Sequence, residues 1–229
     1  MANRPVFLPV LAKDILVKTV FVEFHWFPGF AKSQKKKSLE SLHASATQRL
    51  NTKKILDISS KSDERLGELL SAFNLKFTTK KYNVEMCVES AFQGSKIFEK
   101  GGPYQDLYNA DARTAKKDQR LRSSGRLTGF RFFGINWDLE PLTAFYDWLY
   151  INALTKNPSL ADEIKYYDAF TDIEFNPQKS INCQAYSAAL YRALEQRNLL
   201  SDATSSPASF LDILRNYTPS NVRENTYSC

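Results

Sequence analysis

Histidine and cysteine are scarce in this sequence. Its 229 residues include two His (His25 and His43) and three Cys (Cys87, Cys183 and Cys229). These residues do not stand at the spacing of a zinc-binding motif, so we expect no metal site. The shortage of His also argues against catalysis by a Ser-His-Asp or Cys-His arrangement. An odd and sparse set of Cys is typical of a protein in a reducing cytoplasm.

Long apolar runs and phosphate-binding glycine loops are missing as well. No run of about 18 apolar residues occurs, which argues against a transmembrane helix. The first residues are interrupted by Pro9, Lys13 and Asp14 and do not resemble a signal peptide. Neither a GxGxxG pattern after a strand nor a GxxxxGK pattern followed by Ser or Thr is present. We expect a cytoplasmic protein without membrane attachment, and nothing in the sequence indicates a cofactor.

Aromatic residues and positive charge, by contrast, are plentiful. Sixteen Phe and eleven Tyr contribute to an aromatic content of 13%, which predicts a core or a pocket rich in rings. The net charge of +6 and the pI of about 9.1 favour polyanionic partners such as nucleic acid or phosphorylated ligands. The length suits one large domain, or one domain with an extension.

Strand and helix patterns are interspersed without a regular βαβ order, so the predicted fold class is α+β, with helices dominant and a small sheet. The predicted strands cover residues 17–24, 54–58, 84–88, 127–133 and 170–175. The predicted helices cover residues 33–50, 62–70, 88–98, 111–123, 141–155, 180–197 and 207–215. We expect an N-terminal extension packed on the core over residues 1–64, the core itself over 65–200, and a C-terminal helix and tail over 201–229.

The stretch 88–98 is the strongest candidate for chemistry. As a helix it places Glu89, Gln93 and Lys96 at i, i+4 and i+7 on one face. A carboxylate, an amide and an amine on one face make an acid/base, an orienting group, and a nucleophile or cation. The alternative is a solvated helix face on which Lys96 pairs with Glu99.

Two further polar patterns have a functional and a structural interpretation. Residues 35–37 are three lysines in the first turn of the predicted helix 33–50. That end of a helix is unfavourable for cations, which hints at contact with an anion, and a solvated lysine cluster is the alternative. In the predicted strand 170–175, Asp172 and Glu174 share one face with Asn176. This face is either solvated or one wall of a polar pocket.

Four pieces of the chain together carry a resemblance to a known family. They are residues 70–74 (LSAFN), residues 88–96 (VESAFQGSK), Trp137-Asp138, and residues 170–176 (FTDIEFN) followed by Asn182. In this order and spacing they resemble the NADAR (YbiA-like) family. Residues 99–104 (EKGGPY) and 125–134 (GRLTGFRFFG) are similar in particular to the branch found as the antitoxin beside DarT-type toxins. The sequence departs from the family at Ser90, where a His is usual.

The resemblance implies an α+β glycohydrolase that removes ADP-ribose from guanine bases in DNA and so reverses the modification made by the toxin. On this basis we infer that Glu89 is a general acid/base and that Lys96 attacks ribose C1 through a transient Schiff base. The expected substrate-binding residues are Phe73, Asn74, Gln93, Tyr104, Arg126, Trp137, Asp172 and Asn182.

Within this set the expected roles differ. Gln93 and Asn74 orient the ribose hydroxyls, and Trp137, Phe73 or Tyr104 stacks on a base. Asp172 and Asn182 close the pocket. Basic side chains are expected to hold diphosphate or DNA phosphates: Arg113, Lys116, Arg120 and Arg126. The implied partners are ADP-ribosylated DNA, ADP-ribose as product, and a DarT-type DNA ADP-ribosyltransferase.

Other functions fit the same residues. A YbiA-like N-glycosidase would act on phosphorylated ribosylamine intermediates of flavin synthesis, although the antitoxin-like segments argue against it. A binding module would hold ADP-ribose or the toxin without turnover, and the charge and aromatic content suit it equally well. A purely structural basic domain is the remaining alternative.

Overall fold

The largest sheet joins the N-terminus to a strand near the C-terminal third of the chain. The computed structural model describes residues 1–11, 14–29 and 31–220. The strand order in this sheet is β2-β1-β9-β3, with β1 at Ala2–Pro9, β2 at Val17–Phe24, β9 at Ala169–Thr171 and β3 at Ile55–Asp57. Strands β1 and β2 form an antiparallel hairpin, whereas β3 and β9 are parallel. The predictions of β2 and β3 are confirmed.

Strand β1 has no counterpart among the predicted strands. Pro5 and Pro9 lie within it, and proline normally argues against a strand because it cannot donate to the ladder. Here β9 pairs with β1 only at Phe7. The edge of β1 that faces away from β2 is therefore mostly unpaired, and a strand with prolines is tolerated.

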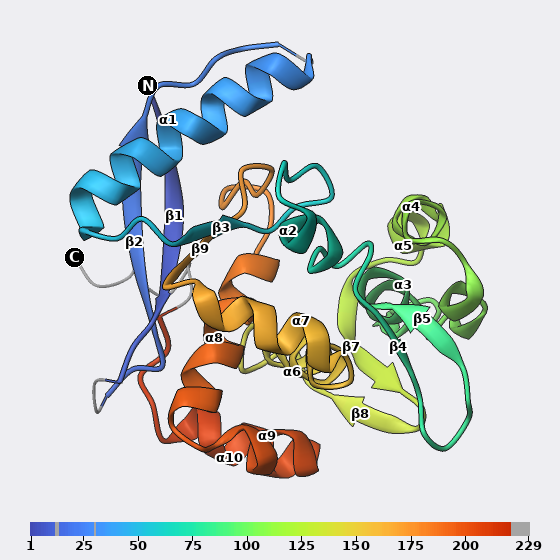
Figure 1. The fold of residues 1–229 in the computed structure, drawn as a ribbon. Coiled ribbons are helices and arrows are strands. Elements are labelled where there is room, and N and C mark those ends of the chain that lie inside the picture. Colours follow the sequence, from blue (N-terminus) through green and yellow to red (C-terminus); the bar gives the residue numbers. More distant parts are fainter. Residues whose placement is uncertain (12–13, 30, 221–229) are drawn as a thin grey trace.

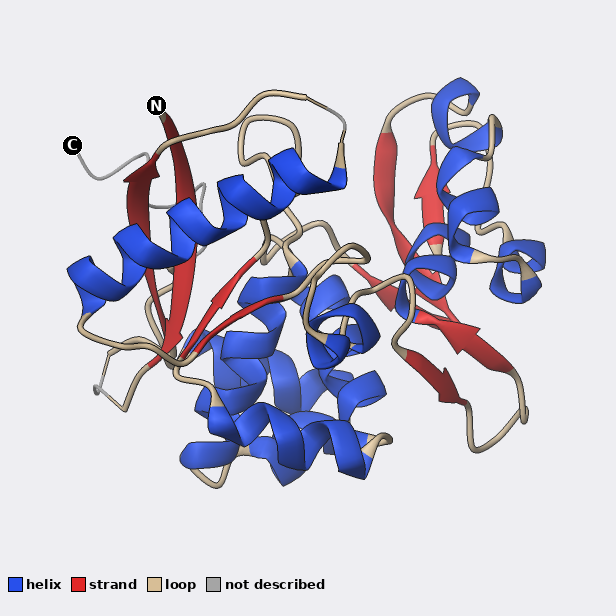
Figure 2. Ribbon diagram, turned by 45° about the horizontal axis from the view of Figure 1, so that its top comes forward, coloured by secondary structure: helices blue, strands red, loops and turns tan. Residues whose placement is uncertain are grey.

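Helix α1 (Lys32–Leu50) lies across one face of this sheet (Figure 2). It buries Leu42 and Ala46 in a small core with residues of β1 and β2 such as Val6 and Val22. The predicted helix 33–50 is thus confirmed, because its apolar stripe is the side that faces the sheet.

Two smaller sheets lie together on the other side of the molecule (Figure 2). One pairs β4 (Lys76–Thr78) with β5 (Glu85–Cys87), and the other has the order β6-β7-β8, with β6 at Lys96–Phe98, β7 at Leu127–Phe132 and β8 at Ile135–Trp137. Phe133 and Gly134 both have positive φ and form the two-residue turn between β7 and β8. Trp137 follows the predicted strand 127–133 and was not assigned to a strand; it lies in β8 because the tight turn lets residues 135–137 pair with β7.

Helices fill the space between the sheets (Figure 1). Helices α6 (Ala144–Thr155) and α8 (Gln184–Gln196) pack against each other in the main core. Tyr150 of α6 is fully buried there and donates a hydrogen bond to the carbonyl of Leu70 (2.8 Å). The other helices in the described part of the chain are α2 (Arg65–Leu69), α3 (Val88–Gly94), α4 (Ala112–Lys117), α5 (Arg120–Ser123), α7 (Pro158–Glu163), α9 (Leu200–Ser205) and α10 (Pro207–Arg215), with short 3₁₀ turns at Gln105–Asn109 and Ile164–Tyr166.

Several predicted elements are interrupted or begin late. The predicted helix 88–98 ends at Gly94, and Lys96 already belongs to β6. The predicted helix 111–123 breaks at Asp118, whose carboxylate accepts from the backbone N–H of Arg120 (2.8 Å) and so turns the chain between α4 and α5. Helices α2, α6 and α8 begin at least three residues later than expected, so Asn182 precedes α8 instead of lying in its first turn.

The predicted strand 170–175 ends at Thr171. Asp172 stops it, because its carboxylate accepts hydrogen bonds from the backbone N–H groups of Glu174 (3.0 Å) and Phe175 (3.1 Å) and so turns the chain. The α+β class itself is confirmed, with small sheets and more helix than strand. None of the helices in the described part of the chain combines the length and the hydropathy that crossing a bilayer requires.

Candidate active site

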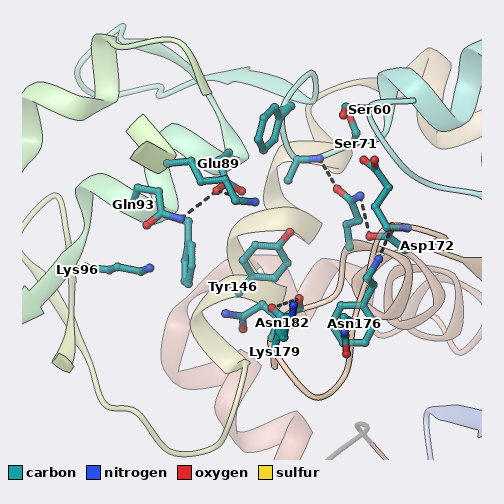
Figure 3. A pocket seen from close by; sticks show the side chains of 18 residues that line it. Ser60, Ser71, Glu89, Gln93, Lys96, Tyr146, Asp172, Asn176, Lys179 and Asn182 are labelled. Carbon is teal, nitrogen blue, oxygen red and sulfur yellow. Dashed lines mark hydrogen bonds and ion pairs between the residues drawn. The ribbon is translucent and has the colours of Figure 1, made fainter. Parts of the chain in front are cut away.

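A cavity of about 430 Å³ lies where the sheets and helices meet, and eighteen residues line it (Figure 3). This volume is within the range of ordinary small-molecule sites, about 300–1,000 Å³. Its walls come from α3, β6 and α4 on one side and from the loop between β9 and α8 on the other. The segment 71–73 before β4, Ser60 after β3, Tyr146 of α6 and Gln184 at the start of α8 complete it.

Helix α3 supplies a buried carboxylate to the cavity. It starts directly after β5, and the backbone N–H of Glu89 donates to the carbonyl of Ala72 (2.9 Å), which holds the start of the helix against the segment 71–73. Glu89 is 6% exposed, and its Oε1 accepts from Gln93 Nε2 (2.9 Å) one turn later. Lys116 of α4 is paired with this carboxylate, with Nζ 3.5 Å from the same oxygen.

The amine of Lys96 reaches the same cavity from strand β6, not from α3. Lys96 pairs with Phe130 of β7 in the sheet, and its Nζ lies 4.7 Å from the ring centroid of Phe92. Among the residues described, no carboxylate lies within ion-pair distance of this amine. Figure 3 shows Lys96 and Glu89 directed into one cavity.

The electrostatic setting of Lys96 favours a neutral amine. Burial lowers the pKa of Lys96 to about 8, the Glu89 carboxylate raises it in part, and the charge of Lys116 lowers it further. An amine with this pKa is partly unprotonated near neutral pH and is able to act as a nucleophile.

Gln93 brings an unsatisfied acceptor to the wall of the cavity. Its Nε2 donates to Glu89, but its Oε1 is buried and has no hydrogen-bond partner within the described residues. A buried acceptor without a partner is unfavourable in the free protein, so a ligand that brings a donor gains affinity there. Tyr146, which is buried in the main core, also lines the cavity, and burial raises the pKa of its phenol well above the usual value.

The opposite wall is held together by Gln184, a residue that the sequence analysis did not single out. Its Oε1 accepts from the backbone N–H of Ala72 (2.7 Å), and its Nε2 donates to the carbonyl of Ile58 (2.7 Å) and to Oδ2 of Asp172 (2.9 Å). Gln184 therefore ties three separate segments of the wall to the start of α8. Its sequence context carries no signal for this role, because all of its partners are distant in the chain.

Asp172 is deeply buried at this wall. Burial and the charge of nearby Asp57 raise the pKa of Asp172 to about 8. Its carboxyl group is occupied by hydrogen bonds from Gln184 and from the turn that follows β9. Asn182 also lines the cavity, in the loop that leads into α8.

Of the ten residues that the sequence assigned to catalysis and substrate binding, the structure brings six together. Those on the cavity wall are Phe73, Glu89, Gln93, Lys96, Asp172 and Asn182. Phe73 carries Lys116 over its ring, with Nζ 5.0 Å from the centroid. Ser90, the position at which a His is usual in the related family, is not on the wall; its Oγ donates to the carbonyl of Ala110 (2.8 Å).

The other four residues lie away from the cavity wall. Asn74 is exposed, and its Nδ2 donates to the carbonyl of Glu68 (2.9 Å). The ring of Tyr104 lies beneath the guanidinium of Arg120, 4.5 Å from its carbon. Arg126 pairs with Glu99, with Nε 3.2 Å from Oε1. Trp137 is buried against Phe145 and Trp148.

In the described part of the chain, no group of three or more His, Cys, Asp or Glu side chains is arranged to hold a metal ion. A comparison with family models gives a match to the DarT1-associated NADAR antitoxin over residues 2–224. No curated protein matches the sequence. Because the family match extends over nearly the whole sequence, the chain belongs to the family of DarT1-associated NADAR antitoxins.

Proposed function

We propose that this protein is an ADP-ribosylglycohydrolase that hydrolyses the N-glycosidic bond between ADP-ribose and guanine in DNA. In this role it reverses the modification made by a DarT-type toxin. The observation that carries the proposal is a buried carboxylate, Glu89, in one cavity with an amine, Lys96, whose pKa is lowered to about 8. Membership in an antitoxin family agrees with such a role.

The proposed reaction uses these two side chains in sequence. Nζ of Lys96 bonds to C1 of the ribose while the bond from C1 to the guanine nitrogen breaks. Glu89 takes the proton that Nζ loses and gives it to the departing nitrogen. Opening of the ribose ring then leaves an imine between Nζ and C1 and a hydroxyl on the former ring oxygen. Addition of one water to the imine carbon releases ADP-ribose and restores the amine.

Other residues of the wall would bind the substrate. The unpaired Oε1 of Gln93 is available to a ribose hydroxyl, and the amide of Asn182 also lines the cavity. For the stacking role, Phe73 is favoured over Trp137 and Tyr104, because Phe73 lines the cavity and carries a cation over its ring. Lys116, next to Glu89, is placed to attract a phosphate.

The test is incubation with an oligonucleotide that carries ADP-ribosylated guanine, with released ADP-ribose measured by mass. The wild-type protein should release ADP-ribose and should be trapped covalently when borohydride is present. Lys96→Arg should do neither, because its guanidinium stays protonated. Glu89→Gln should slow release by about 10²–10⁴-fold, the usual contribution of a general acid/base.

A binding module gives a different outcome in the same experiment. If both variants stay folded, release no ADP-ribose and still protect cells from the toxin, then sequestration accounts for the antitoxin role and the enzymatic proposal is wrong. Activity without a borohydride-trapped adduct would remove only the Schiff-base step.

A further inference from the structure

A second cavity adjoins the first and has basic walls. It has a volume of about 280 Å³ and is lined by the start of α1 and by the loop after β3. Four lysines contribute to it: Lys32, Lys35, Lys36 and Lys61. We call these four residues the lysine groove. Ser60 lines both cavities, so the groove opens beside the candidate active site.

Glu174 stands at the border between the two cavities. It lines the first cavity, and its Oε1 accepts from Lys35 Nζ (2.7 Å) and Lys61 Nζ (3.0 Å) of the groove. These ion pairs link α1 and the loop after β3 to the border of the candidate active site. They also mean that one carboxylate is shared between two ammonium groups, which leaves the border with excess positive charge.

The remaining charges of the groove are not balanced either. Glu68, on its wall, pairs with Arg65 (2.8 Å) outside it. Asp63 lies 3.9 Å from Lys36, at the limit of an ion pair, and both side chains are exposed. Within the described residues Lys32 has no ion-pair partner. The groove therefore carries net positive charge that a bound polyanion would neutralise.

The start of α1 adds to this preference. The helix has no acidic residue in its first turn and no side-chain cap, so lysines stand at the end where the helix dipole already favours anions. Next to the groove, Lys37 Nζ lies 6.0 Å from the ring centroid of Phe27. Basic grooves with neighbouring aromatic rings are the usual surfaces for single-stranded nucleic acid.

We propose that the lysine groove binds the phosphate backbone of the single strand that carries the modified base. The identity of this strand as the substrate rests on the function proposed above. Because Glu89 is buried, a base within a duplex would not reach it, and the modified nucleotide has to be unpaired or turned out of the stack. The backbone beside it would then follow the border at Ser60 into the groove.

The test measures binding of an unmodified single-stranded oligonucleotide containing guanine over a series of KCl concentrations. Lys32→Gln combined with Lys36→Gln should weaken binding. The slope of log affinity against log salt concentration should decrease in magnitude by about 1.4, which is about 0.7 for each lost phosphate contact. These two lysines are chosen because Glu174 does not depend on them. The matched control is Lys18→Gln combined with Lys53→Gln, two exposed lysines that line neither cavity.

Three outcomes would overturn the proposal. The first is a salt dependence of the groove variant equal to that of the wild type, and the second is an equal loss of affinity in the control variant. The third is a parallel loss of affinity for free ADP-ribose, which would assign the groove to the diphosphate of the leaving group instead of the strand.

A separate readout distinguishes this inference from the proposed function. The groove variant should cleave an ADP-ribosylated guanosine nucleoside as fast as the wild type does, because that substrate has no strand to bind. If the wild-type protein cleaves neither the nucleoside nor the oligonucleotide, the proposed function fails, while the salt dependence of binding still decides whether the groove holds nucleic acid.

Discussion

At the scale of single residues, Lys116 offers a way to test how the cavity controls its amine. Its charge lowers the pKa of Lys96, and its Nζ also shares the Glu89 carboxylate at 3.5 Å. Lys116→Gln should raise the pKa of Lys96, because a repelling charge is lost and Glu89 becomes free to attract the amine. Since the neutral amine is the proposed nucleophile, the rise of kcat/KM with pH should then move to higher pH.

The measurement is kcat/KM from pH ~6 to ~9.5, on either side of the wild-type pKa of about 8. Lys117→Gln is the matched control, since Lys117 is an exposed neighbour on α4 that does not line the cavity. A Lys116→Gln profile that superimposes on the wild-type profile would contradict this account of the pKa.

The two amides that the sequence assigned to the ribose hydroxyls, Gln93 and Asn74, are expected to differ in ligand binding. Gln93 lines the cavity with an unpaired Oε1, whereas Asn74 is exposed and occupied by the carbonyl of Glu68. Gln93→Met should weaken the binding of ADP-ribose about tenfold, which corresponds to one net hydrogen bond of about 1.4 kcal/mol. Asn74→Ala should leave that affinity unchanged. Calorimetric titration would measure both, and the reverse ranking of the two variants would disprove the assignment.

At the scale of elements, local patterns predict only what local contacts determine. The bounds predicted for β2, α1 and α10 are correct to within one residue, because the residue types that favour each element lie within its own sequence. The predicted helix 88–98 ends early because residues 96–98 pair with β7, some thirty positions later in the chain. A pattern within eleven residues contains no information about that partner.

The candidate site likewise combines features that the local sequence predicts with features that depend on distant partners. Lys96 reaches the cavity although the helix that was expected to carry it ends at Gly94. Gln184, which ties three segments of the wall together, was missed because its hydrogen bonds reach Ala72, Ile58 and Asp172. The glycine at position 94 was a sequence signal for the end of the helix. The structure gives its reason: a Cβ at Gly94 would lie 2.6 Å from the ring of Tyr108, so only glycine fits where α3 ends.

Strand β6 gives a prediction at this scale, because Gly102 supports the backbone of Lys96. Gly102 has a φ of +89°, and a Cβ there would lie 2.2 Å from the carbonyl oxygen of Lys96. Gly102→Ala should lower the free energy of unfolding by about 1–3 kcal/mol through overpacking, in addition to the strain of a positive φ. It should also reduce activity, because β6 has to shift and Lys96 shifts with it.

Gly134→Ala is the matched control for this change. Gly134 has nearly the same φ, +86°, but a Cβ there would meet nothing within 4 Å. The Gly134→Ala variant should therefore lose only the stability that the backbone strain costs, and it should retain activity. Urea unfolding and the release assay compare the two variants, and equal effects of both on activity would mean that the contact with Lys96 has no functional consequence.

At the scale of the whole molecule, buried carboxyl groups make stability depend on pH. Burial raises the pKa of Asp57 to about 6, of Asp147 to about 7 and of Asp172 to about 8. Between an ordinary carboxyl pKa of 3.8 and these values, the folded protein binds more protons than the unfolded chain. These groups therefore make the protein less stable as the pH rises through that window. His43 opposes them, since burial lowers its pKa to about 4.

Asp147 isolates this effect from catalysis, because it lies in the core between α6 and α8 and does not line the candidate active site. Its carboxyl group accepts hydrogen bonds from Ser187 Oγ and Thr143 Oγ1, each at 2.6 Å. Asp147→Asn keeps the shape and an acceptor but removes the titration, and each hydroxyl is able to act as acceptor or donor. As the pH rises from ~4 to ~7, the free energy of unfolding of the variant should therefore increase relative to that of the wild type, by up to about 1.4 kcal/mol for each pH unit.

Urea unfolding at pH ~5 and pH ~8, on either side of a pKa of about 7, would measure this gain. Asp162→Asn is the control, since Asp162 is an exposed carboxylate whose partner is Lys165. The difference in free energy of unfolding between Asp162→Asn and the wild type should be nearly the same at the two pH values, because an exposed ion pair contributes little. A constant difference for Asp147→Asn as well would show that Asp147 titrates alike in the folded and unfolded chains. Release of ADP-ribose should be unchanged in both variants, because neither residue lines the cavity that holds Glu89 and Lys96.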